Sequence, residues 1–576
     1  MTSKIYFIRH GITEGNIKKW FYGSTDIPLT EEGKRELEII RKNGIYRLPE
    51  GGETGFVTSG LKRTEETLEI LFGKRERKVL ENLREMEFGE YECKSFAELS
   101  GDPVFDRWCM DETGDTALTG GESRNHFRER VREGVRELIG LHRLRELSVR
   151  HNGKDAVTVA VCHGGVISAA MEMLFPEARD NMWQWMPEPG AGFAVYFKDG
   201  GEVMYEEVSG IKKLGFGMMR LPMKDGEIDV EQTMEMVDMF LAHGYTYFDT
   251  AYSYLDGKSE IAVRKALVER HPRESFKLAT KLPAWLAADE ASAKKMFDES
   301  LEKTGAGYFD YYLLHNLGDK RTESFDKYGI WDYLAEKKKQ GLIKNLGFSM
   351  HDTAEALDKV LTDHPEVDFV QLQINYADWD NPSVQSRLCY ETARRHGKKV
   401  VIMEPVKGGS LANMPEAVSG IFREADPKAS AASWAVKFAA SLDGVITVLS
   451  GMSDLEQMRD NLATMDGFTG RLTDEEKKVI AKAVEAINAM PKIPCTECEY
   501  CKKGCPKEIN IPDIFGAMNK YLVFDHLQGA KDSYGFATKN GGKATDCIQC
   551  GQCESVCPQH IKIIDELKKC AETLEG

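Results

Sequence analysis

Two groups of four cysteines in the last part of the chain have the spacing of iron–sulfur cluster ligands. Both follow the pattern Cys-x2-Cys-x2-Cys-x3-Cys-Pro. They comprise Cys495, Cys498, Cys501 and Cys505, and Cys547, Cys550, Cys553 and Cys557. Three thiolates at this spacing wrap one cubane, and the fourth reaches the other cluster. The sequence therefore predicts two [4Fe–4S] clusters, with Cys557 completing the first and Cys505 the second. A pair of zinc sites is the alternative, which the repeated spacing disfavours.

Four residues that could reduce a carbonyl group follow three successive strand-like runs in the middle of the chain. Asp249 and Tyr254 come after the run YTYF, Lys281 after KLAT and His315 after YYLL. Carbonyl reduction needs a hydride on carbon and a proton on oxygen. A free tyrosine, with a pKa of about 10, is a weak acid–base group at neutral pH. We expect the Lys281 ammonium to lower that pKa, Asp249 to hold Lys281, and His315 to orient the substrate oxygen.

A third set of residues, in the first part of the chain, could transfer a phosphoryl group. Arg9 and His10 directly follow the strand-like run SKIYFI. Together with Arg63 in TSGLKRTEET, Glu85 in LREMEFGEYE and His163 in VAVCHGG, they resemble the histidine phosphatase superfamily, and the resemblance implies that these residues act together. The arginines and the second histidine would neutralise the charge of a phosphoryl group. His10 would attack phosphorus through a neutral nitrogen to give a phosphohistidine. Glu85 would protonate the leaving oxygen and then help to activate water, so no metal is needed.

The run RHGITEGN…YGSTDIPLTEEG and the residues above resemble the histidine phosphatase (phosphoglycerate mutase-like) superfamily over about the first 200 residues. The resemblance implies that Asn16, Gly23 and Gly164 complete the phosphate pocket. Ile12 stands where mutases usually carry a glutamate, which favours a phosphatase over a mutase. The run is also similar to ribazole-phosphate phosphatases, which does not fix the substrate.

The segment that holds Asp249, Tyr254, Lys281 and His315 resembles the aldo-keto reductases along its whole length. The family's catalytic Asp, Tyr, Lys and His are all present, and Ser349 and Gln373 match positions that hold the nicotinamide amide. The resemblance implies a cofactor site made of Ser349, Gln373, Glu404, Lys407, Gly451, Ser453, Gln457 and Asn461.

Several of these cofactor positions depart from the family pattern. The usual Ser-Asn pair is Ser349-Met350, and Glu404 replaces the aromatic residue that commonly stacks on the nicotinamide. The basic residues that grip a 2′-phosphate are replaced by Gly451 and Gln457, although such a phosphate favours Arg or Lys nearby. We therefore predict that the cofactor is NAD(P)H, with NADH used at least as readily as NADPH.

The secondary-structure pattern supplies elements that would position these residues. From residue 211 to residue 488, short apolar runs alternate with amphipathic helical stretches such as VEQTMEMVDMFLAHG. Eight strand candidates in this length predict a (β/α)₈ barrel, in which functional groups lie at the C-terminal ends of the strands. Residues 1–209 also alternate strand-like and helical stretches, which predicts a three-layer α/β domain.

The cysteine-rich segment, residues 489–576, forms the third predicted domain, and its start is marked by Pro491 and Pro494. The stretch 511–535 between the two cysteine groups has a helical pattern. The segment therefore resembles an α-helical ferredoxin module more than the compact β-rich one. The remaining cysteines show no ligand spacing and are expected to be ordinary thiols: Cys93, Cys109, Cys162, Cys389 and Cys570.

Composition and charge restrict the surroundings of the protein. The formal net charge of −17 argues against binding to nucleic acid or to an anionic membrane face. No apolar run is long enough to span a bilayer, and the start, MTSKIYFIRHG, has no signal-peptide core. We expect a cytoplasmic protein, where 13 cysteines favour metal or cluster binding over disulfides.

The sequence as a whole predicts an iron–sulfur oxidoreductase that interconverts carbonyls and alcohols with NAD(P)H, fused to a metal-independent phosphomonoesterase. The expected partners are small-molecule carbonyls and phosphomonoesters and a redox partner protein. The alternative is a phosphatase with a reductase-like regulatory module and structural clusters. Nicotinamide moves two electrons and a cluster moves one. A flavin could couple them, but no G-x-G-x-x-G fingerprint follows a strand, so a flavin is not indicated.

Overall fold

The computed structural model describes residues 3–42, 44–46, 48–49, 52–150, 153–178, 182–197, 203–208, 212–382, 384–468, 470–495, 499–502 and 504–576. The chain divides into two compact units, one of residues 1–212 with 243–246 and one of residues 213–242 with 247–576. In the described part, no helix is both long and apolar enough to cross a membrane.

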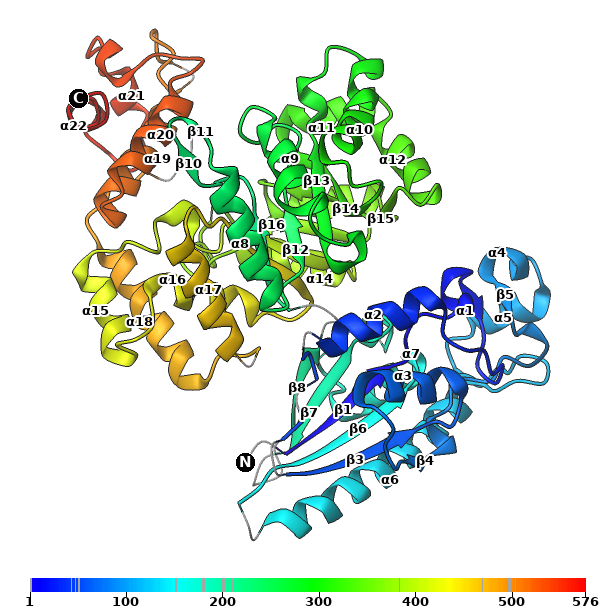
Figure 1. Cartoon of the computed structure of the whole chain (residues 1–576). Coiled ribbons are helices and arrows are strands. Elements are labelled where there is room, and N and C mark those ends of the chain that lie inside the picture. Colours follow the sequence, from blue (N-terminus) through cyan, green and yellow to red (C-terminus); the bar gives the residue numbers. More distant parts are fainter. Residues whose placement is uncertain are drawn as a thin grey trace. The chain divides into compact units, whose positions relative to one another are not determined.

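The first unit is built on a six-stranded sheet with strand order β4-β3-β6-β1-β7-β8 (Figure 1). Its strands are β1 (Lys4–Arg9), β3 (Glu53–Thr58), β4 (Lys78–Val79), β6 (Ala156–Cys162), β7 (Gly192–Phe197) and β8 (Val203–Val208). A small second sheet pairs β2 (Trp20–Phe21) with β5 (Lys94–Ser95). Its helices are α1 (Glu14–Ile17), α2 (Glu31–Lys42), α3 (Lys62–Phe72), α4 (Phe96–Leu99), α5 (Pro103–Met110), α6 (Arg124–Arg150) and α7 (Gly164–Leu174).

Alternation along β1 explains the three layers of this unit, because successive side chains of a strand point to opposite faces. Tyr6 and Ile8 pack with Leu37 of α2 and Leu68 of α3 on one face. Ile5 and Phe7 belong to the core of the other face, which α6 and α7 cover. The predicted three-layer α/β fold is therefore confirmed.

Two glycines of this unit provide a test of its packing. A Cβ at Gly192 on β7 would lie 1.8 Å from the carbonyl oxygen of Phe7, whereas one at Gly140, exposed on α6, would meet nothing within 4 Å. We expect Gly192→Ala to destabilise the unit by about 1–3 kcal/mol and Gly140→Ala to stabilise it by about 0.5–1 kcal/mol. The denaturant midpoint for unfolding of this unit measures both, and shifts of equal sign would contradict the packing described.

The second unit contains a closed barrel of eight parallel strands, as the sequence predicts. In order around the barrel they are β12 (Tyr247–Asp249), β13 (Lys277–Leu282), β14 (Phe309–Leu317), β15 (Ile343–Met350), β16 (Phe369–Gln373), β17 (Lys399–Met403), β18 (Val445–Ser450) and β9 (Leu214–Gly217). The helices of this region are α8 (Val230–Ala242), α9 (Lys258–Val263), α10 (Glu290–Thr304), α11 (Asp319–Lys327), α12 (Ile330–Lys339), α13 (Ala354–Asp363), α14 (Ser386–Arg395), α15 (Glu416–Ala425), α16 (Ala431–Ala440), α17 (Leu455–Gly467) and α18 (Asp474–Ala489). A short hairpin of β10 (Met223–Lys224) and β11 (Glu227–Ile228) follows β9.

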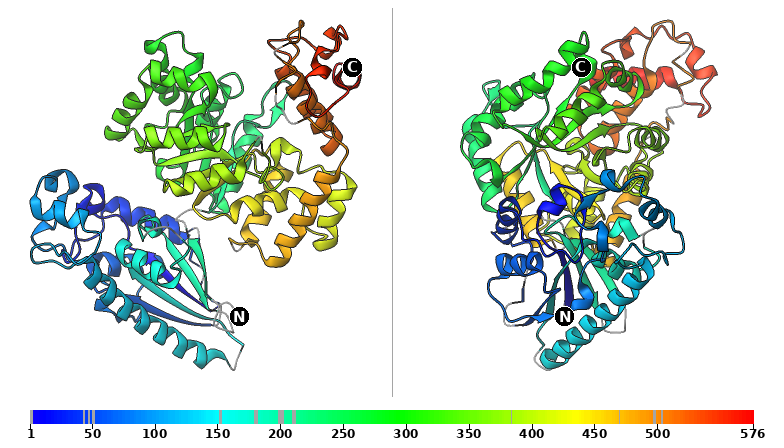
Figure 2. Two further views of the ribbon diagram at one scale, coloured as in Figure 1. Left: turned by 180° about the vertical axis from the view of Figure 1, so that it is seen from behind. Right: turned by 90° about the vertical axis from the view of Figure 1, so that its right-hand side faces the viewer.

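The cysteine-rich segment of the second unit is helical and packs on the barrel helices. It contains α19 (Ile511–Phe524), α20 (Leu527–Ala537), α21 (Gln552–Ser555) and α22 (Ile563–Leu574). Val523 and Phe524 at the end of α19 share one apolar core with Phe422 of α15 and Ile480 of α18. Figures 1 and 2 both show the orange α19 beside the yellow and amber helices of the barrel. The end of this segment is therefore anchored on the barrel by apolar contacts.

Candidate functional site

His10 directly follows β1 and is 3% exposed. Its Nδ1 lies 2.8 Å from the carbonyl oxygen of Gly11. A carbonyl can only accept a hydrogen bond, so Nδ1 must carry the proton and Nε2 keeps its lone pair. Burial lowers the pKa of His10 well below its usual value, and the positive charges of Arg63 and Arg9 act in the same direction. The ring is therefore neutral, with Nε2 as its nucleophilic atom.

Arg63 and His163 lie beside His10, with the two imidazole centroids 5.3 Å apart. The fully buried Arg63 donates from Nε to Nδ1 of His163 over 3.3 Å and from Nη2 to the carbonyl of Gly23 over 2.8 Å. Since Nδ1 accepts, Nε2 of His163 donates to Ser59. Arg63 and His163 thus form a buried layer beside His10, and Gly23 is tied to them through its carbonyl group.

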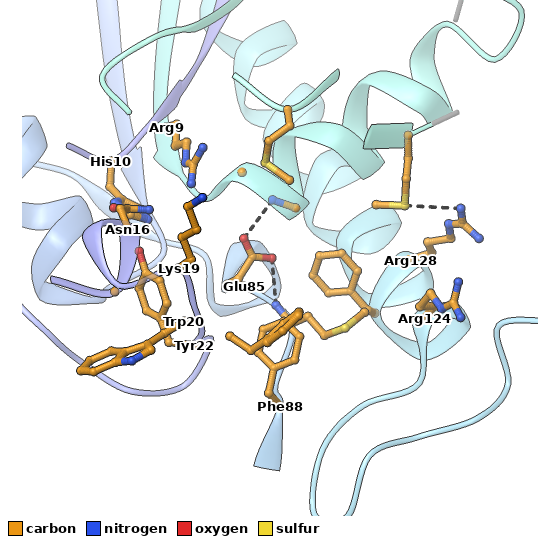
Figure 3. A pocket seen from close by; sticks show the side chains of 18 of the residues that line it. Arg9, His10, Asn16, Lys19, Trp20, Tyr22, Glu85, Phe88, Arg124 and Arg128 are labelled. Carbon is orange, nitrogen blue, oxygen red and sulfur yellow. Dashed lines mark hydrogen bonds between the residues drawn. The ribbon is translucent and has the colours of Figure 1, made fainter. Parts of the chain in front are cut away.

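Glu85 faces the same site from the loop that follows β4. Its carboxylate accepts hydrogen bonds from the backbone N–H of Met86 over 3.0 Å and of Gly165 over 2.9 Å (Figure 3). Gly165 belongs to the first turn of α7, where the positive end of the helix dipole favours an anion. These bonds hold the carboxylate in a fixed position on the wall of the cavity that His10 lines.

A cavity of about 300 Å³ connects these groups. Of the predicted residues, it is lined by Arg9, His10, Asn16, Glu85 and Gly164; Arg63, His163 and Gly23 lie behind its wall. Sequence reasoning did not predict the following residues, which also line the cavity: Lys19, Trp20, Phe21, Tyr22, Phe88, Trp108, Arg124, Phe127, Arg128, Met182 and Met186. The sequence signal for this part of the cavity was the pair Arg124 and Arg128, which are four residues apart at the start of a helical pattern.

In the barrel, Lys281 connects the predicted carbonyl-reducing residues. Its buried ammonium lies 2.5 Å from Oδ1 of Asp249 and 3.2 Å from the hydroxyl oxygen of Tyr254, and it donates to the carbonyl of Thr250 over 2.8 Å. The rings of Tyr254 and His315 stand edge to face with centroids 5.6 Å apart. The structure therefore brings all four residues together at the C-terminal ends of β12, β13 and β14.

The acid–base state of this group differs from the sequence-based expectation at Tyr254. Burial raises the pKa of the phenol, and the Lys281 ammonium opposes this without reversing it. The predicted net lowering is therefore wrong, because desolvation of the phenolate outweighs the nearby cation. The tyrosine is protonated, which is the form that can donate a proton to a reduced carbonyl oxygen.

His315 is the second polar group that faces Tyr254. Burial lowers its pKa well below the usual value, and the charge of Lys281 adds to this effect. Its Nδ1 is buried without a hydrogen-bond partner among the described residues. Trp285 lies against its other side, with ring centroids 5.4 Å apart. A neutral imidazole beside a phenol and an indole can orient a substrate oxygen but carries no charge of its own.

The predicted nicotinamide positions lie at the ends of β15, β16 and β17, where Ser349 is bonded separately from a polar network of Gln373, Asp378 and Lys407. Ser349 accepts a hydrogen bond from the backbone N–H of Asn316 over 2.7 Å. Gln373 donates to Asp378 over 3.2 Å, and Asp378 also binds the ammonium of Lys407 at 2.6 Å. The orientable amide of this network and the hydroxyl group of Ser349 fit the carboxamide end of a nicotinamide.

Glu404 follows β17 in a left-handed conformation with φ of 53°. It is exposed, and its carboxylate raises the pKa of Tyr254 as one of several smaller causes. An acidic group therefore lies near Tyr254, at the position where the family resemblance usually places an aromatic residue.

The predicted adenosine-end residues are joined to one another at the start of α17. The side-chain oxygen of Gln457 accepts a hydrogen bond from the backbone N–H of Ser453 over 2.9 Å. The backbone carbonyl of Gln457 accepts one from the side-chain amide of Asn461 over 2.8 Å. Gly451 lies next to Arg220, whose Cδ is 3.5 Å from the place a Cβ would take. Sequence reasoning missed Arg220, because it lies far away in the chain.

Three cations gather around Gly408, in the loop after β17. A Cβ there would lie 3.6 Å from Nη2 of Arg220 and 3.9 Å from Nζ of Lys520 on α19. Burial lowers the pKa of Lys520, Lys407 and Arg220 lower it further, and Glu404 opposes them. The cysteine-rich segment therefore contributes a positive charge to the barrel end that carries the cofactor positions.

The described cysteines line two small cavities. One is lined by Cys495, Cys501 and Cys557, and the other by Cys505, Cys547, Cys550 and Cys553. Cys498 lies outside the described residues. Among those described, no three His, Cys, Asp or Glu side chains converge on a single metal ion. The cysteines that line each cavity are nevertheless grouped so that the last cysteine of each motif lies with the other motif. Ile511 lines both cavities, so each offers thiols within an apolar wall that fits a cubane.

These folds and sites define a multidomain enzyme of the α/β class. Residues 5–206 match the family model of the histidine phosphatase superfamily (branch 1), residues 213–485 that of the aldo/keto reductase family, and residues 494–561 that of the 4Fe-4S dicluster domain.

Individual relatives match single domains. The probable phosphoglycerate mutase GpmB of Serratia proteamaculans is 29% identical over 143 residues, which are 24% of this chain and 64% of the mutase. The adenosylcobalamin/alpha-ribazole phosphatase of Salmonella typhimurium is 24% identical over 205 residues, which are 34% of this chain and 92% of the phosphatase. A solved aldo-keto reductase from Klebsiella pneumoniae in complex with NADPH is 20% identical with a TM-score of 0.38, covering 48% of this chain and 92% of that one.

The chain is therefore a fusion of a histidine phosphatase domain, an aldo/keto reductase domain and a 4Fe-4S dicluster domain, in the order that the sequence predicts. It is an NAD(P)-dependent oxidoreductase of the aldo/keto reductase type that also carries a histidine phosphatase domain.

Proposed function

We propose that the first unit hydrolyses phosphomonoesters through a phosphohistidine on His10, without a metal ion. The observation that supports this most is the tautomer of His10, which leaves the Nε2 lone pair available in a cavity that Arg9 and Glu85 also line. Nε2 attacks phosphorus and the ester oxygen leaves with a proton from Glu85. Water, activated by the same carboxylate, then cleaves the phosphohistidine and releases inorganic phosphate.

Hydrolysis is favoured over phosphate transfer between two positions of one sugar acid. Ile12 offers no acid–base group where the family's mutases usually carry a glutamate. Incubation of an aryl phosphate with the protein and excess chelator tests the proposal. Release of inorganic phosphate with an acid-labile phosphoenzyme supports it, whereas activity that disappears with the chelator would contradict it.

We propose that the barrel reduces a small-molecule carbonyl with NAD(P)H. When bound, the cofactor supplies the hydride. Tyr254 donates the proton to the carbonyl oxygen, Lys281 holds the phenol in place, and His315 orients the oxygen. Steady-state NADH oxidation with a panel of aldehydes tests this against the alternative, in which the barrel is a regulatory binding module. Cofactor binding without turnover on any carbonyl would favour the module.

For the cofactor, we propose that NADH is used at least as readily as NADPH. Gly451 and Gln457 offer no positive charge to a 2′-phosphate. Arg220 lies beside Gly451 with the aliphatic part of its side chain, and its Nη2 lies close to Gly408. Dissociation constants of the two reduced cofactors, measured by fluorescence, compare them directly. A strong preference for NADPH would overturn this proposal.

For the cysteine-rich segment, we propose two [4Fe–4S] clusters with crossed fourth ligands. Cys505→Ala is expected to lower the iron content from roughly eight to roughly four per chain, because it removes a ligand of one cluster only. Adding Cys547→Ala should cost no further iron, whereas adding Cys495→Ala should remove the rest. Iron and sulfide quantification after anaerobic purification checks this. The reverse pattern, in which Cys495→Ala adds nothing, would mean that each motif binds its own cluster.

A further inference from the structure

The phosphatase cavity has positive groups at two separate places. Figure 3 shows Arg9 and Lys19, next to the neutral His10, on one side of the cavity and Arg124 and Arg128 on the other. The phosphoryl group needs only the first of these places, because His10 is the nucleophile. The second place therefore has no role in the reaction proposed above.

Arg124 and Arg128 occupy a position on α6 that does not favour cations. Arg124 is the first residue of the helix, where the positive end of the dipole repels a positive charge, and Arg128 lies in the next turn. They are four residues apart, so the two like charges lie on one helix face. Purely structural arginines would be better placed at the other end of α6. An anion bound in the cavity would offset both the repulsion by the helix dipole and the repulsion between the two arginines.

The hydrogen bonds of the two guanidinium groups are incomplete. Nη2 of Arg124 donates to the carbonyls of Trp108 and Asp111, and Nη2 of Arg128 lies 3.2 Å from the carboxylate of Glu172. The Nε atoms of both arginines are buried and have no partner among the described residues. A buried donor without an acceptor is unfavourable, and a ligand oxygen would remove that cost.

Glu85 lies between the two positive places (Figure 3), and much of the remaining cavity wall is apolar. Its walls include Phe88, Trp108 and Phe127, and Trp108 and Phe88 meet edge to face with centroids 6.2 Å apart. Met182 lies beside Arg128 and Met186 beside Gly164, and such side chains adapt to flat ligands. The volume of about 300 Å³ is at the lower end for small-molecule pockets, which suits a ligand with one ring system.

We propose that this site selects phosphomonoesters whose alcohol part carries an apolar ring and, beyond it, a second anionic group that binds Arg124 and Arg128. This rests on the proposed phosphatase function and names its substrate class. The second group is a carboxylate or a second phosphate, because both offer the paired oxygens that a guanidinium fork binds.

The test uses the full-length protein and three aryl phosphates that differ only at the end remote from the ester: a carboxamide, a carboxylate and a phosphonate. We expect kcat/KM to be about tenfold higher for the anionic compounds than for the amide. Arg128→Gln and Arg124→Gln should each remove that preference, measured as the ratio of kcat/KM for an anionic compound to kcat/KM for the amide in the same variant. Arg132→Gln, which alters an exposed pair with Glu129 one turn further along α6, is the matched control and should keep it.

The outcomes separate this inference from the phosphatase proposal itself. Equal rates on all three esters, or a preference that survives both substitutions, would overturn the second anion site while leaving the phosphatase intact. Lack of hydrolysis of every ester would overturn the phosphatase proposal instead. In that case, calorimetry with non-hydrolysable analogues, in which a phosphonate replaces the phosphate ester, still tests the arginines. Arg128→Gln is expected to bind the analogues with a remote anionic group more weakly, and unchanged binding would refute the second anion site. A carboxylate–phosphonate difference identifies which anion the site prefers.

Discussion

His10→Ala is expected to reduce phosphomonoester hydrolysis by at least about 10³-fold. The substitution removes the Nε2 lone pair that would form the covalent intermediate, and no other side chain of the cavity can replace it. Arg9 and Lys19 are positively charged, and the carboxyl group of Glu85 is held by two backbone N–H groups. Release of inorganic phosphate from an aryl phosphate measures the effect. Only binding and charge stabilisation remain in the variant.

Two controls make this result specific to the nucleophile. His126 lies on α6 with its side chain 70% exposed and next to Glu122, so His126→Ala should keep full activity. Reduction of aldehydes by the barrel should be unchanged in both variants. Rapid acid-free quenching with a labelled substrate should trap label on the wild-type protein and on His126→Ala alone. Labelling of His10→Ala would show that another residue is the nucleophile.

The pH profile gives a second readout of the same residue. A histidine with an ordinary pKa of about 6.5 loses its nucleophilic form as the pH falls through that value. Burial and the neighbouring arginines lower the pKa of His10, so its neutral form persists to lower pH. The acidic limb of kcat/KM is therefore expected well below pH 6.5. A limb near pH 6.5 that follows the ionisation of His10 would contradict the burial described here.

The features that sequence reasoning identified share a local signature. The cysteine motifs are defined by short spacings, and Asp249, Lys281 and His315 stand at the ends of recognisable strands. A parallel barrel brings such strand ends together whatever the loops do, so their meeting could be expected in advance. The same holds for His10, which directly follows the first strand of its sheet.

The features that sequence reasoning missed depend on packing between distant segments. The aromatic wall at Trp108 and the pair Arg124 and Arg128 face His10 only because α5 and α6 fold over the cavity. Lys520 reaches Gly408 because Val523 and Phe524 anchor α19 on barrel helices. The direction of the Tyr254 pKa was also wrong, since a motif names the neighbouring cation but not the depth of burial.

Tyr254→Phe is expected to reduce carbonyl reduction by about 10²–10⁴-fold, the usual worth of a positioned proton donor. His315 is neutral and Lys281 already donates to Asp249 and to the carbonyl of Thr250, so neither replaces the phenol. Steady-state oxidation of the reduced nicotinamide with a reactive aldehyde measures the loss. Cofactor affinity should not change, because the hydroxyl contacts Lys281 and not the residues of the carboxamide network.

The matched control is Tyr252→Phe, on the same loop. That hydroxyl donates to Glu299 at 2.7 Å and lies outside the Asp249–Lys281–Tyr254 group. It should keep the wild-type rate. Lys281→Met is a poorer test, since it leaves a buried Asp249 without its ion pair and is expected to destabilise the barrel by about 3–5 kcal/mol. Full activity of Tyr254→Phe would exclude the phenol as the proton donor.

The same variant separates hydride transfer from electron transfer to the clusters. Proton donation to a carbonyl oxygen is needed only when a carbonyl is reduced. If cluster absorbance in Tyr254→Phe still bleaches when NADH is added anaerobically, electrons reach the clusters by a route that does not require this acid. If bleaching is lost together with aldehyde reduction, the two processes share Tyr254. Absence of bleaching even in the wild type, with clusters that dithionite reduces, would assign the clusters to a separate redox partner protein.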